Sequence, residues 1–299
     1  MSDKEKTYDY PAPVNQLLAY GDCMKMRDWP DYLKLGLTQE HVSDLIRMAT
    51  DMDLHWEDGK SLYVWAPVHA WRALGQLRAE AAIEPLIPLF HAFEEQGGSD
   101  WTSDELPQVF AMIGAAAIPA FSAYLADATH IEYPRADASS SLRHIAEAHP
   151  ETREQVVAIL TLQLEDFTNN GEFLNSLIIN DLMDLKAVES LPVIQKAFEA
   201  DVVDLMVQGD YDDVLVDMGL KEPDPDKISV NRGIFSRLAA MFPDTADIDN
   251  KPSGERQVFG TGFDLEAMKA VRKRDDAARK KEKAKRKHTK KMKKQNRKR

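Results

Sequence analysis

The stretch "AWRALGQLRAEAAIEPLIPLF", residues 70–90, contains two helical patterns separated by a short polar break. Apolar side chains recur every three or four positions from Pro67 to Leu77, which predicts an amphipathic helix. The same periodicity returns from Ala81 to Phe90. There, Pro88 is expected to bend the helix because proline lacks the N–H that a helix interior needs. The stretch therefore predicts an αα-hairpin.

The pattern of the second helix returns at a regular interval, as expected of a repeat protein. The segment "AIEPLIPLF" at Ala82 is followed 35 residues later by "AIPAFSAYL" at Ala117, and 70 residues after that by "AVESLPVIQKAF" at Ala187. Another hairpin pattern occupies residues 134–166, between the last two copies. Because an amphipathic helix precedes each copy, we expect an all-α solenoid of four stacked hairpins.

These repeats resemble HEAT repeats of the short E-Z type, which occur in phycobilisome lyases and in bacterial proteins. The resemblance rests on "ALGQLRAEAAIEPLIPLF" and its later copies, and it covers residues 61–201. It implies a HEAT-like αα-hairpin solenoid but no single activity, because the family includes scaffolds, lyase subunits and hydroxylases. In deoxyhypusine hydroxylase such repeats hold iron on His-Glu dipeptides. This sequence contains no His-Glu dipeptide, so we expect neither a metal nor a cofactor.

Composition divides the chain into four regions. Residues 1–60 are expected to form an N-terminal helical cap, in which Thr38 is a candidate helix N-cap. Residues 61–220 contain the repeats and an acidic C-terminal cap. Residues 221–262 are rich in Pro, Asp and Gly and are interpreted as a linker, and residues 263–299 as a flexible basic tail, helical or disordered.

Charge is strongly segregated along the chain. Residues 269–299 carry a net charge of +15, whereas the remainder carries −27. The tail is expected to bind RNA, the ribosome or another polyanion through phosphates, without reading sequence because it has no aromatic side chain for stacking. Two alternatives remain open, a solubilising appendage and docking on the chain's own acidic body. The predicted polyanion-binding residues are Arg279, Lys280, Lys281, Lys283, Lys285, Arg286, Lys287, Lys290, Lys291, Lys293, Lys294, Arg297, Lys298 and Arg299.

One face of the helix that starts near Pro67 combines aromatic and polar side chains. Trp65, His69, Arg72 and Gln76 follow one another at spacings of 4, 3 and 4, which places them together. Since Trp and Arg dominate interface hot spots, we predict that this face binds a protein partner, and a basic one given the acidic body. In the structural alternative, Trp65 packs between repeats and Arg72 pairs with an acidic neighbour. In a third interpretation, a lyase-like enzyme or enzyme subunit holds a small ligand here.

Other features favour a non-catalytic scaffold or adaptor in the cytoplasm. No run of about 18 apolar residues is present, the N-terminus lacks a secretory pattern, and the tail has no apolar face for membrane insertion. Cys23 is the only cysteine, which excludes an internal disulfide, and no motif supports it as a nucleophile. We therefore predict no catalytic residue.

Overall fold

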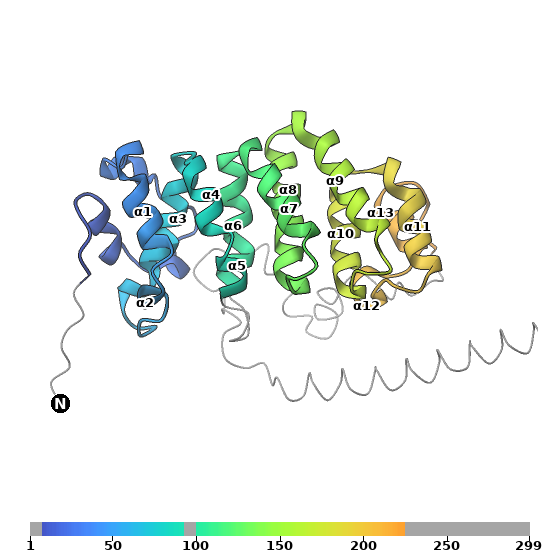
Figure 1. Ribbon diagram of the computed structural model, residues 1–299, viewed down its shortest axis with the longest axis horizontal. Coiled ribbons are helices and arrows are strands. Elements are labelled where there is room, and N and C mark those ends of the chain that lie inside the picture. Colours follow the sequence, from blue (N-terminus) through green and yellow to red (C-terminus); the bar gives the residue numbers. More distant parts are fainter. Residues whose placement is uncertain (1–7, 93–99, 225–299) are drawn as a thin grey trace, which may run out of the picture. The chain divides into compact units, whose positions relative to one another are not determined.

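The computed structural model describes residues 8–92 and 100–224 (Figure 1). Within these two ranges the chain is all-helical and contains no strand, which confirms the predicted fold class at this level. The chain divides into two units, residues 1–246 and 247–299, and every described residue belongs to the first. The predicted tail, with all its candidate polyanion-binding residues, lies outside the described residues, as does the predicted linker from residue 225 onward.

Most described residues belong to helices or to short 3-10 turns. The α-helices are α1 (Val42–Ala49), α2 (Met52–His55), α3 (Ala66–Gln76), α4 (Ile83–Leu86), α5 (Leu89–Ala92), α6 (Asp100–Ile113), α7 (Ile118–Ala126), α8 (Glu132–Ala148), α9 (Arg153–Glu165), α10 (Glu172–Asp184), α11 (Leu191–Glu199), α12 (Leu205–Gln208) and α13 (Tyr211–Asp217). The 3-10 turns are η1 (Val14–Ala19), η2 (Cys23–Lys25), η3 (Tyr32–Leu35), η4 (Gln39–His41), η5 (Leu62–Trp65), η6 (Glu80–Ala82), η8 (Ala115–Ala117), η9 (Pro150–Thr152) and η10 (Val188–Ser190).

The predicted N-cap at Thr38 is confirmed for the 3-10 turn η4, which runs directly into α1. Its side chain accepts a hydrogen bond from the backbone N–H of Glu40, and the His41 side chain closes a capping box onto the Thr38 backbone. These bonds satisfy N–H groups that a helix start leaves without intrahelical partners. The following helix, α1, then buries Leu45 and Met48.

The helices of the opening stretch lie where their periodicity predicts. Helix α3 starts and ends within one residue of the expected span from Pro67 to Leu77. The second helix is interrupted at Ile87 and Pro88, between the end of α4 and the start of α5, as the missing proline N–H requires. The later copies of the pattern are also helical, in α7 and α11.

A recurring turn connects the two helices of a pair. Arg78, Gly114 and Lys186 adopt positive φ angles of 51°, 102° and 52° after α3, α6 and α10. Each is followed by a 3-10 turn (η6, η8 or η10) that leads into the next helix. A residue with positive φ at the end of a helix stops its hydrogen-bond ladder and redirects the chain, and Gly114 does so with a ψ of −158°, outside the left-handed helical region. This local geometry sets where the second helix of each pair begins.

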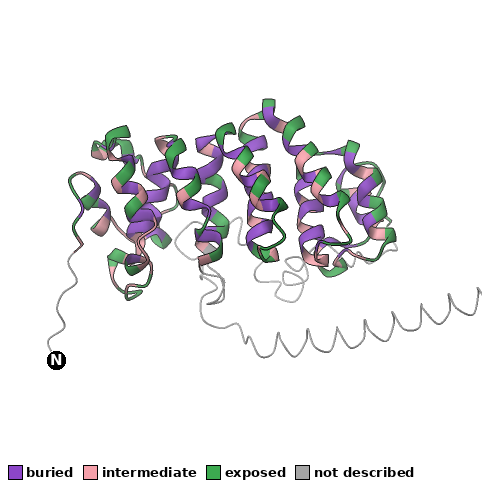
Figure 2. Cartoon of the chain, viewed as in Figure 1, coloured by how far each residue is buried: buried purple, intermediate pink, exposed green. Residues whose placement is uncertain are grey.

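The first helices of successive pairs pack against one another. Helix α3 contacts α1 and α6, α8 contacts α6 and α10, and α10 also contacts α12. Helix α9 contacts α7, α8, α10 and α11. Buried residues gather where neighbouring helices meet (Figure 2), and the rings of Phe110 and Phe121 pack edge to face at 4.6 Å. Contact with the next helix therefore buries the apolar face of each pair.

Length and apolar composition decide whether the helices in the described ranges could span a membrane. No single helix there is long and apolar enough to cross a bilayer. Trp101–Ile113 and Ala115–Ala126 reach the required length and composition only as a pair bent by 113°.

Candidate functional site

The structure places His69, a predicted partner-binding residue, in a fully buried cluster under the N-terminal segment. Its Nε2 lies 3.0 Å from the Gly21 carbonyl, and its Nδ1 lies 2.7 Å from the Tyr32 hydroxyl. Because a carbonyl only accepts, Nε2 carries the proton and Nδ1 accepts from Tyr32. The Cys23 thiol lies 3.5 Å from Nε2. Burial lowers the pKa of His69 to about 4, so the ring is neutral at pH 7.

Arg72, the next predicted residue, forms a buried ion pair with Glu105 of α6. Its Nε donates to Glu105 Oε2 at 2.8 Å, and its Nη2 donates to Oε1. The indole N–H of Trp71 donates to the same Oε2 at 3.1 Å. Burial disfavours the charge of Arg72, but the hydrogen bonds and charge of Glu105, together with the neighbouring Cys23 and Tyr32, outweigh this effect and raise its pKa. The guanidinium therefore remains charged and links α3 to α6.

The two remaining predicted residues also contact other parts of the chain. Gln76 donates to the Pro30 carbonyl at 2.7 Å and accepts from the backbone N–H of Tyr32 at 2.9 Å. Trp65 packs edge to face on Trp101, with ring centroids 5.0 Å apart. These contacts of Trp65 and of Arg72 match the structural alternative for this face. Partner binding at this face stays a prediction.

A pocket of about 320 Å³ lies between α8 and α10, and sequence reasoning missed it. The side chains that line it come from one face of each helix. They are Ala136, Asp137, Ser140 and Arg143 from α8, and Leu177, Asn180, Asp181 and Asp184 from α10. Their spacings of three and four residues are visible in the sequence. Only the tertiary structure shows that these two helix faces meet.

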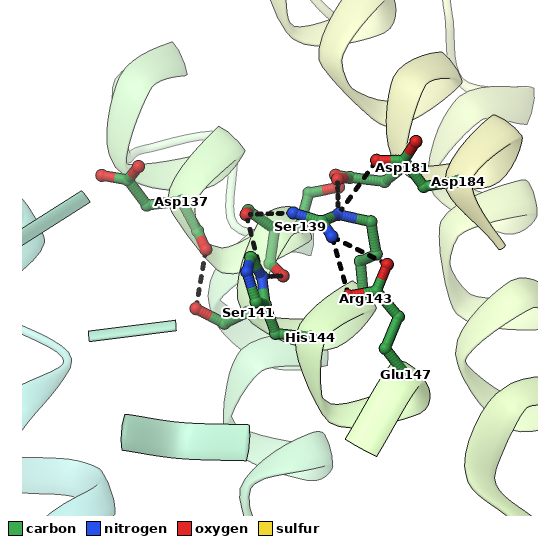
Figure 3. A network of polar contacts seen from close by, with 9 residues as sticks. Asp137, Ser139, Ser141, Arg143, His144, Glu147, Asp181 and Asp184 are labelled. Atoms are coloured by element: carbon green, nitrogen blue, oxygen red, sulfur yellow. Dashed lines mark hydrogen bonds and ion pairs between the residues drawn. The ribbon is translucent and has the colours of Figure 1, made fainter. Parts of the chain in front are cut away.

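Arg143 is the central cation of this site and is held by carboxylates from both helices. Its Nε lies 2.9 Å from Asp181 Oδ1 and 3.5 Å from Asp184 Oδ2. Its Nη1 donates to both carboxylate oxygens of Glu147, each at 2.9 Å. The Ser139 hydroxyl donates to the other oxygen of Asp181 at 2.5 Å. Figure 3 shows these groups converging from the two helices.

The electrostatics of the site are dominated by carboxylates. Burial raises the pKa of Asp181 to about 7, although hydrogen bonds from Ser139 and the charge of Arg143 act to lower it. Asp137 and Asp184 line the same pocket, and Glu147 lies beside it on Arg143. Acidic groups thus outnumber the one guanidinium, which suits a cationic ligand.

The part of the chain that the structure describes contains no cluster of side chains suited to bind a metal ion. No group of three or more His, Cys, Asp or Glu side chains is placed there to hold a metal ion. The thiol of Cys23 is buried, and this burial raises its pKa to about 12. A thiolate is the form that binds metals and attacks substrates, so this thiol is poorly suited to either role.

Fold and site together define a protein of packed helix pairs with an acidic pocket between two of its helices. The chain belongs to the family described as "Protein of unknown function (DUF1186)", whose model matches residues 39–223. The matched segment runs from η4 to beyond α13 and contains both helices of the pocket. Neither the curated proteins nor the solved structures contain a match to this chain.

Proposed function

We propose that this protein is a non-catalytic scaffold or adaptor whose helix pairs form a HEAT-like solenoid and bind a basic protein partner in the cytoplasm. The E-Z type resemblance, the recurring turn after α3, α6 and α10, and the contacts between successive helices support the solenoid. Each pair in a solenoid buries its apolar face on its neighbours and leaves other faces available for partners.

The acidic pocket between α8 and α10 is the main support for binding of a basic protein. Asp181 and Asp184 contact a single guanidinium there, Arg143, and Asp137 also lines the pocket. A carboxylate-rich surface attracts basic segments and repels nucleic-acid phosphates. The partner of the helical body is therefore a basic protein rather than an RNA.

The lyase-like alternative would use the α3 face, where the buried cluster lies. There His69 is neutral, and both of its ring nitrogens already have hydrogen-bond partners. The high pKa of Cys23 also disfavours a thiolate in this cluster. These features favour a scaffold over an enzyme that uses this histidine or thiol.

The basic tail supplies a second binding role in this proposal. Residues 269–299 carry a net charge of +15 and tether the assembly to RNA or another polyanion by releasing condensed counterions. The body and the tail thus have different targets, because their charges have opposite signs.

Ultraviolet crosslinking in cells tests the tether. The full chain is compared with a chain that ends at Met268, each carrying the same affinity tag. Tail-dependent recovery of RNA supports the tether, and sequencing of the RNA distinguishes ribosomal from other targets. Background recovery from both chains would remove RNA from the proposal. Protein partners of the helical body should be recovered in equal amount with and without residues 269–299, because the tail has a different target.

A further inference from the structure

We propose that the α8–α10 pocket receives the side chain of an arginine or lysine from an extended basic segment of the protein partner. The inference rests on the proposed function and assigns it a site. Three features of this groove carry it: the size of the pocket, the arrangement of its carboxylates, and an aromatic pair one helical turn away.

The pocket has the size of a side-chain subsite. Its volume of about 320 Å³ corresponds to about ten water molecules at liquid density. This space accommodates a long side chain and its hydration, but not a folded element of a partner. Leu177 and Ala136 line it on opposite helices and offer apolar contacts to an aliphatic stem, while the carboxylates take the charged end.

The carboxylates are arranged to accept a second cation beside Arg143. Asp181 is buried and contacts the Arg143 guanidinium at 2.9 Å, whereas Asp184 is 3.5 Å away and its side chain is 59% exposed. Asp137 lines the pocket from the opposite helix, and its Oδ2 accepts a hydrogen bond from the Ser103 hydroxyl of α6 at 3.1 Å. Arg143 therefore neutralises the inner part of the site, and the carboxylate of Asp184 still faces solvent, where an incoming ammonium or guanidinium reaches it.

An aromatic pair extends the groove by one turn on both helices. Tyr133 and Phe173 pack with ring centroids 4.7 Å apart, and Tyr133 is 49% exposed. Tyr133 precedes Asp137 by four residues on α8, and Phe173 precedes Leu177 by four residues on α10. Residues four apart share a helix face, so rings and carboxylates follow one another along the groove. Aromatic faces beside carboxylates recognise cationic side chains through both stacking and charge.

Binding of a fluorescein-labelled peptide, with arginines separated by Gly-Ser, to the full chain tests the site. The same peptide with citrulline at each arginine is the uncharged control of equal shape. The pocket variant combines Asp137→Asn with Asp184→Asn. The matched control combines Glu154→Gln with Glu165→Gln, two exposed carboxylates on α9, so both variants lose the same charge. Fluorescence anisotropy at low and at physiological salt gives each dissociation constant, and circular dichroism checks that each variant is folded.

We expect the arginine peptide to bind the wild type, the citrulline peptide to bind at least about tenfold more weakly, and the pocket variant to lose about tenfold in affinity for arginine. The α9 control should change affinity by less than about twofold, because an exposed charge that does not line the pocket contributes little. Tyr133→Ala should weaken binding about threefold to tenfold through loss of stacking.

Three other outcomes would each overturn a different part of the proposal. Equal losses in the pocket variant and the α9 control would show nonspecific attraction to an acidic surface, which rejects this pocket and leaves a basic partner in place. Absence of arginine-dependent binding to the wild type, even at low salt, would reject both the pocket and the basic-partner proposal. Displacement of the peptide by spermidine at concentrations below the peptide's own dissociation constant would assign the site to a free polyamine instead of a protein side chain.

Discussion

Arg72 in α3 and Glu105 in α6 lie 33 residues apart in the chain and form a doubly hydrogen-bonded ion pair in which both side chains are buried. Trp71 donates to the same carboxylate, so the two helices are joined by three hydrogen bonds to one residue. Two charges withdrawn from water are tolerated because each neutralises the other, although Arg72 Nη1 is buried without a hydrogen-bond partner among the described residues.

Removal of one partner of this pair should be costly. We expect Glu105→Gln or Arg72→Leu to lower the free energy of unfolding by about 3–5 kcal/mol, because each leaves a buried group without its counter-charge. The double variant Arg72→Met with Glu105→Leu should be more stable than either single variant. Urea unfolding followed by circular dichroism measures these differences.

A partly exposed pair provides the matched control for this prediction. Arg153 and Glu189 contact at 3.0 Å and are both accessible to solvent. Glu189→Gln should therefore lower the free energy of unfolding by no more than about 1 kcal/mol. If Glu105→Gln and Glu189→Gln lowered the free energy of unfolding equally, burial would not be what makes the Arg72–Glu105 pair important.

Acid should weaken the buried His69 cluster. The pKa of His69 is about 4 in the folded protein and about 6.5 when unfolded, so between these values the unfolded chain binds a proton that the folded protein does not. Stability from this group is therefore present above pH 6.5 and is lost as the pH falls toward 4. Between pH 7.5 and 5 the loss should be about 2 kcal/mol, and His69→Gln should remove it. Unfolding free energies of both proteins at the two pH values are the test, and parallel pH profiles would reject it.

Asp181 should have the opposite pH dependence. Its pKa is raised to about 7 in the folded protein, so between pH 4 and pH 7 the folded protein binds a proton that the unfolded chain has released. Its contribution to stability is therefore largest in acid and falls as the pH rises toward 7. Asp181→Asn should gain stability relative to wild type between pH 5 and 7.5, by on the order of 2 kcal/mol. A variant that gains nothing over this range would show that Asp181 is charged throughout.

Cys23 should be unreactive in the native protein. Burial raises its pKa to about 12, which leaves about a thousandfold less thiolate at pH 8 than an ordinary thiol provides. Modification by a thiol-specific disulfide reagent should therefore be at least about a thousandfold slower in the folded protein than in urea. Complete labelling of the native protein within minutes would instead show a reactive thiol and favour the lyase-like alternative for the α3 face.

The sequence predicted the helices well because their signals are local. Periodicity placed α3 to within one residue, and the missing N–H of Pro88 explains the break between α4 and α5. The N-cap at Thr38 depends on hydrogen bonds to residues two and three positions away. Interactions of this range can be found without knowledge of the rest of the fold.

Only the tertiary structure decided which helix faces meet. Helical spacing placed His69, Arg72 and Gln76 together, but it did not show that residues 21–32 and Glu105 contact them. The pocket between α8 and α10 depends on Arg143 meeting Asp181, 38 residues further along the chain. A helical pattern defines which side of a helix is polar or apolar. The partner of that side depends on how the helices pack, and packing is set by the whole chain.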